Sequence, residues 1–131
     1  MFQKLMVANR GEIACRIIKT ARNLGIKTLA IYSDSDKNSA HVLLADEACY
    51  VGPSVASKSY LNIKKILEIA VVRNVDAIHP GYGFLSENHA FSKKIESKGI
   101  AFIGPGWKTI KTMGNKKNAK QAVLKAGIPT V

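Results

Sequence analysis

The sequence contains no apolar run that approaches the roughly 18 residues of a membrane span. Its first residues, MFQKLMVANRGE, lack the build of a signal peptide, because the apolar stretch is short and runs directly into a charged segment. These absences predict a cytoplasmic protein that has no membrane contact. With 131 residues, 47% of them hydrophobic and 22% charged, the chain is long enough for one folded domain and is not a disordered tail.

Cysteine is also scarce, because the chain holds only Cys15 and Cys49. No CxxC motif or cluster of histidine and cysteine accompanies them, so we predict two reduced core thiols and no zinc or other metal site. No Ser/His/Asp or Cys/His arrangement can be read from the sequence either. These absences leave no residue that we assign as catalytic.

Acidic residues are missing from the last part of the chain, where seven lysines follow Ser97. Such a run of one sign attracts phosphate groups or nucleic acid. Aromatic residues do not interleave with these lysines, and no helix-turn-helix pattern is present, so we do not predict nucleic-acid binding. A solvated helix face balanced by a partner segment explains the run equally well. The lysines are Lys98, Lys108, Lys111, Lys116, Lys117, Lys120 and Lys125.

Short apolar segments alternate with helical patterns along the chain. The apolar segments are uninterrupted, which is typical of strands in a parallel sheet that is covered on both faces. We therefore predict one compact α/β domain with a doubly wound parallel sheet, whose ligands bind beyond the carboxyl ends of the strands. The predicted strands are 4–9, 27–33, 47–52, 76–80 and 100–105, and the predicted helices are 11–25, 39–46, 59–74, 87–99 and 115–129.

The helical patterns also predict buried faces and caps. The first long helix is expected to end at Gly25 and to bury Ile13, Ile17, Ala21 and Leu24. The helix at 59–74 is expected to be capped by Ser57 or Ser59 and to bury Ile63, Ile66, Leu67, Ala70 and Val71. Ser86 is predicted to cap the helix that follows.

The first strand-to-helix loop argues against a dinucleotide site. It reads ANRGEIA, with one glycine where a pyrophosphate-binding turn has G-x-G-x-x-G, and a P-loop pattern is also absent. Gly11 therefore serves only the sharp turn in this interpretation. Arg10 and Arg16 are expected to pair with acids or to contact a partner. A nicotinamide-dependent dehydrogenase is excluded by the missing glycines.

The connection HPGYGFLSEN, from His79 to Asn88, is unusual for a loop between a strand and a helix. Pro80 ends strand pairing, and Gly81 and Gly83 allow backbone angles that other residues avoid. Tyr82 is expected to project between them at the carboxyl end of its strand, and Phe84 and Leu85 look exposed. We interpret His79 as a structural histidine.

Several segments together resemble a known family. They are ANRGEIA, IKTLAIYSDSD, HVLLADEA, SYLN, HPGYGFLSEN, FIGP and MGNK. In this order they resemble the first part of biotin carboxylases, the ATP-dependent components of acetyl-CoA, propionyl-CoA, methylcrotonyl-CoA and pyruvate carboxylases. The resemblance runs from about Lys4 to Val131. It implies a Rossmann-like domain over residues 1–114, followed at 115–131 by the start of the connection to an ATP-grasp domain.

The resemblance implies an activity for the full-length protein. Biotin carboxylases use ATP with Mg²⁺ or Mn²⁺, and bicarbonate, to carboxylate biotin on a carrier protein. A carboxyltransferase then passes the carboxyl group on, as in the acetyl-CoA carboxylase of fatty acid biosynthesis. The metal-binding acids and the residues that act on bicarbonate lie beyond residue 131. We therefore expect residues 1–131 to contain no catalytic residue, to bind no cofactor tightly and to be inactive alone.

Few site residues of the family fall within the sequence. Lys116, in MGNK, matches a lysine that contacts ATP. The family pattern is usually MGDK, and Asn115 replaces its acid but can still cap a helix. Tyr82 and Gly83 match the loop that faces the biotin site.

A homodimer contact is also implied by the resemblance. Arg16, Lys19 and Asn23 fall on the helix face that many bacterial members use for it, although Lys19 and Asn23 replace the usual arginine and acid. Two other classes remain open. One is a stand-alone binding or dimerisation module without chemistry. The other is a different ATP-grasp ligase, which would not be expected to carry both ANRGEIA and HPGYGFLSEN.

Overall fold

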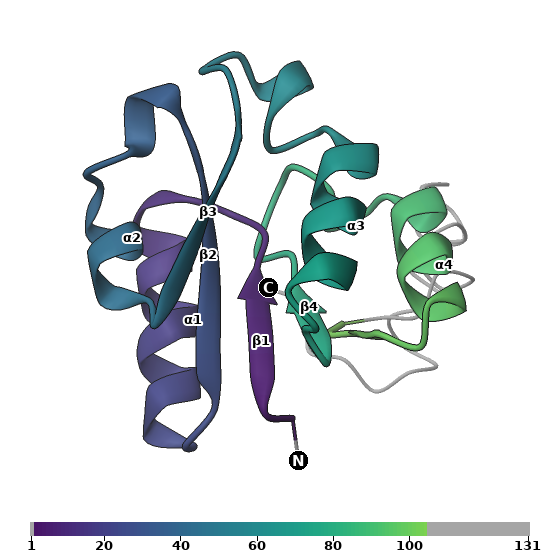
Figure 1. Ribbon diagram of the computed structural model, residues 1–131, viewed down its shortest axis with the longest axis horizontal. Coiled ribbons are helices and arrows are strands. Elements are labelled where there is room, and N and C mark those ends of the chain that lie inside the picture. Colours follow the sequence, from purple (N-terminus) through teal and green to yellow (C-terminus); the bar gives the residue numbers. More distant parts are fainter. Residues whose placement is uncertain (1, 105–131) are drawn as a thin grey trace, which may run out of the picture.

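The computed structural model describes residues 2–104, which form a five-stranded parallel sheet (Figure 1). The strand order is β3-β2-β1-β4-β5, so the sheet grows in both directions from the central β1. This order confirms the predicted doubly wound architecture. The strands are β1 (Lys4–Val7), β2 (Lys27–Ser33), β3 (Glu47–Gly52), β4 (Ala77–His79) and β5 (Ala101–Phe102).

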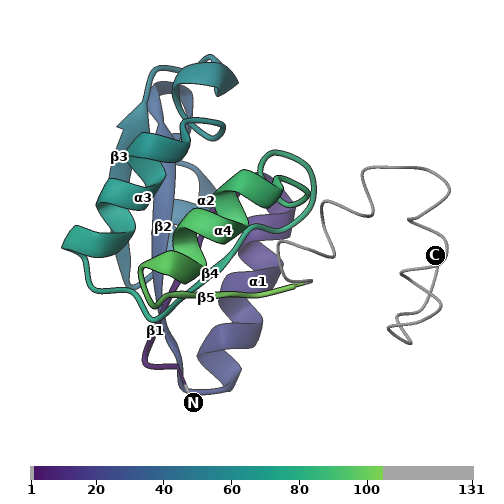
Figure 2. The same ribbon diagram turned by 90° about the vertical axis from the view of Figure 1, so that its right-hand side faces the viewer.

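Helices cover both faces of the sheet. α1 (Gly11–Asn23) and α2 (Ala40–Leu44) lie on one face, and α3 (Ile63–Val72) and α4 (His89–Ser97) lie on the other (Figures 1 and 2). Side chains alternate along each strand, so β1 supplies both layers. Met6 packs in the layer under α3 and α4, whereas Leu5 and Val7 pack under α1. Two single-turn helices, η1 (Asp34–Asp36) and η2 (Ala56–Lys58), complete the described elements.

The three long helices end in the same way, with a residue in the left-handed region after the last turn. Gly25 follows α1 at φ +76°, Asn74 follows α3 at φ +55°, and Gly99 follows α4 at φ +76°. After α1, the N–H of Gly25 bonds to the Arg22 carbonyl and that of Ile26 to the Ala21 carbonyl, at 3.0 and 2.9 Å. These hydrogen bonds satisfy carbonyls that the helix leaves open and direct the chain back into the sheet.

The predicted caps were wrong at two helices. Asn62 caps α3, where its side chain accepts the Lys65 N–H at 3.1 Å, and Asn88 caps α4 by accepting the Phe91 N–H at 2.9 Å. Ser59 lies in the preceding turn instead, where its Oγ donates to the Val55 carbonyl at 3.0 Å. Ser57 and Ser86 also lie before the first turn of the helices that they were predicted to cap.

The predicted buried face of α1 was also wrong in part. Ala14, Ile18 and Ala21 are buried, whereas Leu24 is 56% exposed and Ile13 and Ile17 are half-buried. Small residues let α1 approach the strands closely, and the larger Ile13 and Ile17 lie on its flank. On α3, Ile69 is buried and the predicted core residue Val71 is exposed. Cys15 and Cys49 are free thiols, as predicted, and both are half-buried.

Candidate functional site

The loops at the carboxyl ends of the strands contact one another. The N–H of Ala8, just beyond β1, donates to the carbonyl of His79 at the end of β4, at 2.9 Å. Ser35 and Ser54, which follow β2 and β3, are hydrogen-bonded, with the Ser35 N–H 3.1 Å from the Ser54 hydroxyl. This edge of the sheet is where a doubly wound domain binds its ligands.

The connection from β4 to α4 has an unusual backbone. Gly81, Gly83 and Phe84 have φ values of +68°, +69° and +43°. Glycine adopts such angles at little cost, whereas Phe84 is a bulky residue in a region that such residues rarely occupy. A turn follows, in which the Ser86 N–H donates to the Gly83 carbonyl at 2.9 Å. These three positive φ values, at positions 81, 83 and 84, direct Tyr82 away from the sheet.

Asn9, at the end of β1, holds this loop from below. Its side-chain Nδ2 donates to the carbonyls of Pro80 at 2.8 Å and Tyr82 at 2.7 Å. Its Oδ1 accepts the Arg10 N–H at 2.8 Å. Asn9 is 2% exposed, so both its amide nitrogen and its amide oxygen find their hydrogen-bond partners within the protein.

Gly81 is the point of closest approach between this asparagine and the loop. A Cβ at position 81 would lie 2.7 Å from Asn9 Nδ2 and 3.0 Å from Ile13 Cγ2. Gly81 is therefore required both for its backbone angle and for space. At Gly83, by contrast, a Cβ would meet no atom within 4 Å among the described residues other than Gly83 itself and its two chain neighbours, so only the backbone angle favours glycine.

The far side of the loop is held by two apolar side chains that the sequence suggested were exposed. Leu85 is buried, and Phe84 packs against the core beneath α3. The ring of Phe84 stacks on Tyr60, with centroids 5.2 Å apart and planes inclined by 27°. The expectation of exposure was wrong because the positive φ at Phe84 turns both side chains inward.

A buried carboxylate lies next to this stack. Asp36 is 4% exposed and accepts two hydrogen bonds from Arg10, from Nε at 2.6 Å and from Nη2 at 2.7 Å. The Tyr60 hydroxyl donates to the same carboxylate at 2.6 Å. The Arg10 hydrogen bonds, opposed by burial and assisted by Tyr60, hold the pKa of Asp36 well below its usual range. Burial, together with the bond to Asp36, raises the pKa of Tyr60.

This ion pair determines the partners of the acidic residue that follows β2. In dinucleotide-binding domains an acid near this position binds a ribose hydroxyl. Here the Asp36 carboxylate is bonded to Arg10 and to the Tyr60 hydroxyl instead. The predicted pairing of Arg10 with an acid is confirmed, and so is the turn at Gly11, which has φ +67°.

Tyr82 is the most exposed of the large hydrophobic residues that the structure describes, at 78%. It lies at the rim of an apolar groove of about 780 Å³ between the flank of α1 and the face of β4 and β5 that α1 leaves uncovered. Arg16, Glu87 and His79 add polar groups to this groove, and Ile13 and Ile17 supply part of its apolar wall. The predicted projection of Tyr82 at the strand end is confirmed.

His79 lies between the groove and the loop. Its Nδ1 accepts the Gly81 N–H at 3.1 Å, which places the ring proton of the neutral form on Nε2. Burial lowers the pKa of His79. The imidazole is therefore held neutral and fixed in orientation, which fits the interpretation of a structural histidine.

The other predicted site residues have separate locations. Arg16, Lys19 and Asn23 are all exposed and follow one another along α1, and Arg16 also lines the groove. Gly83 lies beside Tyr82 in the loop. Lys116 lies outside the described residues, as does the predicted final helix. The sequence did not point to Asn9, Asp36 or Tyr60, although Asn9 and Asp36 follow predicted strands at the ligand-binding edge.

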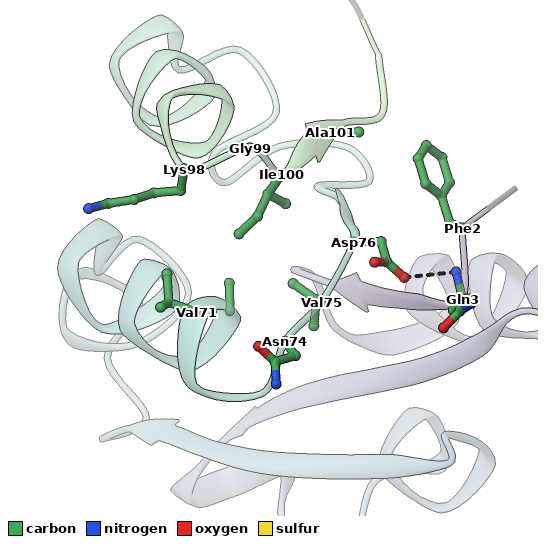
Figure 3. A pocket seen from close by; sticks show the side chains of 11 residues that line it. Phe2, Gln3, Val71, Asn74, Val75, Asp76, Lys98, Gly99, Ile100 and Ala101 are labelled. Atoms are coloured by element: carbon green, nitrogen blue, oxygen red, sulfur yellow. Dashed lines mark hydrogen bonds between the residues drawn. The ribbon is translucent and has the colours of Figure 1, made fainter.

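A second hollow, of about 610 Å³, lies at the opposite edge of the sheet, where α3 and α4 end (Figure 3). Beside it Asp76 accepts the backbone N–H groups of Gln3 and Lys4 at 2.8 and 2.9 Å, which joins the start of β1 to the start of β4. These hydrogen bonds lower the pKa of Asp76. The hollow is remote from the loop that carries Tyr82, and we assign it no ligand.

Among residues 2–104, no group of three or more histidine, cysteine or acidic side chains is arranged to hold a metal ion. None of the helices in this part of the chain is long and apolar enough to cross a bilayer.

Comparison with known proteins identifies the family. The family described as "Biotin carboxylase, N-terminal domain" matches residues 1–110. The chain is 52% identical over 131 residues to the biotin carboxylase of Haemophilus influenzae, covering 100% of this chain and 29% of that protein. It is 52% identical over 128 residues to the alpha subunit of the mitochondrial methylcrotonoyl-CoA carboxylase of Dictyostelium discoideum, covering 98% and 18%.

A solved structure shares the fold over the whole chain. It is the biotin carboxylase domain dimer of the Hydrogenobacter thermophilus 2-oxoglutarate carboxylase, in complex with MgADP, ADP and bicarbonate. The TM-score is 0.86 at 50% identity, and the match covers 100% of this chain and 29% of that one. The chain therefore spans less than a third of the length of each of these relatives.

Proposed function

This chain belongs to the biotin carboxylase N-terminal domain family, and on that basis we propose that it is part of a biotin-dependent carboxylase and forms one wall of the site where biotin is carboxylated. In the complete reaction, bicarbonate provides the carboxyl group that is transferred to biotin on a carrier protein, and cleavage of ATP to ADP and phosphate drives the transfer. The remainder of the protein supplies the catalytic groups, and this domain supplies a fixed surface.

The arrangement of Tyr82 is the observation that carries this proposal. A rigid loop, held by Asn9 on one side and by Phe84 and Leu85 on the other, presents Tyr82 to solvent at the ligand-binding edge of the sheet. An exposed aromatic ring beside an apolar groove is a suitable surface for the apolar rings of a biotin-sized ligand. Gly83 leaves its backbone open to close approach.

We propose that the described residues do not form a MgATP site by themselves. Asp36, the acid at the end of β2, is bonded to Arg10, and residues 2–104 hold no acidic cluster arranged for a metal ion. We propose that ATP and Mg²⁺ or Mn²⁺ are bound by the ATP-grasp remainder, with Lys116 contacting the nucleotide. ATP affinity of residues 1–131 alone is then weak and sensitive to salt, because it depends on lysine charge.

The exposed apolar groove provides the surface on which this remainder packs. Its walls include Ile13, Ile17 and Leu24, and Leu24 is more than half exposed. Apolar area of this extent is stabilised when a second domain covers it. The neighbouring Arg16, Lys19 and Asn23 are proposed to contact a second copy, and the Hydrogenobacter relative is a dimer. The biotin carrier and the carboxyltransferase are the further proposed partners.

The final carboxyl acceptor is a separate question. The similar proteins include a methylcrotonoyl-CoA carboxylase and a 2-oxoglutarate carboxylase, so the domain is shared by enzymes with different acceptors. This is expected, because the acceptor is used in the second half-reaction. That the acceptor is acetyl-CoA, and that the enzyme is cytoplasmic and takes part in fatty acid biosynthesis, stay predictions.

The proposed function is tested by ATP hydrolysis that depends on bicarbonate and biotin, measured on residues 1–131 and on the chain extended to its natural C-terminus. Activity in the extended chain alone is the expected result. Activity in neither chain favours a binding or dimerisation module that has kept the fold. A sub-micromolar Kd of residues 1–131 for MgATP at physiological salt contradicts the assignment of ATP binding to the remainder.

A further inference from the structure

We propose that Asn9 is a positioning residue for the biotin-carboxylation site, because it sets the position of Tyr82 and Gly83 from the neighbouring strand. The inference rests on the proposed function. It gives a functional reason for the contact between two segments, ANRGE and HPGYG, which meet only in the folded sheet. Within these segments, Asn9 and Tyr82 are separated by 73 positions in the sequence.

The orientation of the Asn9 amide is fixed by its partners. The carbonyls of Pro80 and Tyr82 can only accept hydrogen bonds, so the amide nitrogen must face them. The Arg10 N–H can only donate, so Oδ1 must face that group. The amide of Asn9 thus supplies a donor to two backbone carbonyls and an acceptor to one backbone N–H. An aspartate of similar size lacks the donor, and a leucine lacks both.

The loop's own residues restrain it in part, because the Gly81 N–H donates to His79 Nδ1 and the Ser86 N–H donates to the Gly83 carbonyl. Asn9 adds a restraint on the carbonyl of Tyr82 itself. Gly81 and Gly83 lack side chains, so the chain on either side of Tyr82 has the widest range of backbone angles available to any residue. The Tyr82 side chain, which is largely exposed, supplies no packing restraint. The two Asn9 bonds to the carbonyls of residues 80 and 82 span Gly81 and select one conformation from this range.

Asn9 also joins the loop to the centre of the sheet. It follows the central strand β1, and Gly81 packs directly against its side chain. Phe84 anchors the other end of the loop through Tyr60. Tyr82 is therefore held between two anchors, and of these two Asn9 is the one that hydrogen-bonds to the Tyr82 carbonyl.

The test uses the full-length protein and the substitution Asn9→Asp, which keeps the size and the Arg10 bond but places an oxygen against two carbonyl oxygens. We expect kcat/KM for free biotin to fall from about tenfold to about a hundredfold, while KM for ATP stays within about twofold. Misplacement of a binding loop has effects of this size. Limited digestion with chymotrypsin should also cut after Tyr82 faster in the variant.

Thr28→Val is the matched control. Thr28 is buried near the start of β2, at the end of the sheet away from the Tyr82 loop. Its hydroxyl takes part in two hydrogen bonds with Asp46, both of 3.3 Å. This variant loses two side-chain hydrogen bonds, as Asn9→Asp does, but should keep the native kinetic constants and the native rate of cleavage after Tyr82.

The outcomes separate the inference from the proposed function. Absence of biotin-dependent ATP hydrolysis in the unmodified full-length protein overturns the proposed function. An active unmodified protein whose Asn9→Asp variant has unchanged biotin kinetics overturns the positioning role alone. A variant in which the constants for ATP and biotin change in parallel, with no faster cleavage after Tyr82, also overturns it, because a general loss of folded protein gives that result.

Discussion

Tyr60 connects two parts of the structure that are far apart in the sequence: its ring stacks on Phe84 at a centroid distance of 5.2 Å, and its hydroxyl donates to Asp36 at 2.6 Å. The ring of Tyr60 therefore supports the loop that carries Tyr82, and its hydroxyl adds a hydrogen bond to the buried carboxylate that pairs with Arg10. Each of these contacts can be removed separately, which makes their contributions measurable.

Removal of the Tyr60 hydroxyl should destabilise the domain without displacing the loop. Tyr60→Phe keeps the stack but loses the bonds to Asp36 and to the Ser33 N–H, at 2.6 and 3.2 Å. We expect the free energy of unfolding to fall by about 1.5 kcal/mol, measured by urea denaturation. Tyr82→Phe is the control, because that hydroxyl is on the surface. Equal effects of the two substitutions would show that the buried hydroxyl has no special role.

The Arg10–Asp36 pair predicts a dependence of stability on pH. The pKa of Asp36 is lowered in the folded state, so the stability from this pair is complete above the unfolded pKa of about 3.9 and is lost as pH falls through the folded pKa. Arg10→Met should lower the free energy of unfolding by about 2 kcal/mol at pH 7. The difference between native and variant should narrow below about pH 4. A constant difference down to strongly acidic pH would contradict this account.

The two glycines that flank Tyr82 should respond differently to alanine. Their φ values are nearly equal, +68° and +69°, so the backbone penalty is the same, about 1 kcal/mol. Gly81→Ala carries the additional contact with Asn9 Nδ2, at 2.7 Å, whereas Gly83→Ala places its methyl in open space among the described residues. Urea denaturation should therefore show a larger loss at position 81. The reverse order would mean that the loop moves freely enough to remove the contact.

A larger side chain at Gly83 should affect activity more than folding. Gly83→Val introduces a β-branched residue at positive φ on the open side of the loop, next to Tyr82. In the full-length protein we expect a greater loss of biotin carboxylation than the loss of folded protein can explain. The measurement is the carboxylation rate per folded molecule, with the folded fraction taken from circular dichroism. Native activity in a well-folded variant would remove Gly83 from the biotin site.

His79 should titrate below the ordinary histidine value. Its pKa is lowered by burial, so the neutral form is favoured in the folded state and protonation is favoured on unfolding. Stability from this group is complete above the unfolded pKa of about 6.5 and is lost as pH falls from there through the folded pKa. The ring signals of His79 in an NMR titration give the folded value. A midpoint at or above 6.5 would contradict the effect of burial.

The sequence predicted the strands well where apolar runs were long and bounded by polar residues. β2 at Lys27–Ser33 and β3 at Glu47–Gly52 coincide with their predictions, whereas β5 is shorter than predicted. The face of α1 was misassigned because two of its buried positions are alanines, and the larger Ile13 and Ile17 dominate a hydrophobic pattern without lying deepest. A hydrophobic pattern reflects the size of the side chains as well as the direction in which they point. It therefore cannot distinguish residues at the centre of the buried face of a helix from those on the flank of that face.

The site was predictable in its motifs and not in its internal contacts. HPGYGFLSEN indicated a special loop from its glycines and proline, and family resemblance supplied Tyr82 and Gly83. The support from Asn9 joins groups 71 and 73 positions apart, a separation at which local patterns carry no information. The exposure of Phe84 and Leu85 was misjudged because nothing local signals a positive φ at a phenylalanine. Lys116 stays a prediction, since it lies beyond the residues that the structure describes.

The position of β1 in the middle of the sheet has a consequence for how the chain folds during synthesis. β1 is made first, but its partner β4 begins at Ala77, and the two strands are joined at their start by Asp76, 72 positions after Lys4. The central strand therefore has one open edge until more than half of this domain has left the ribosome. Contacts of such separation form slowly, and an unpaired apolar strand is prone to aggregate in the meantime. A chaperone that binds extended apolar segments would therefore have most time to bind this strand. That time ends when the loop that Asn9 contacts has been synthesised.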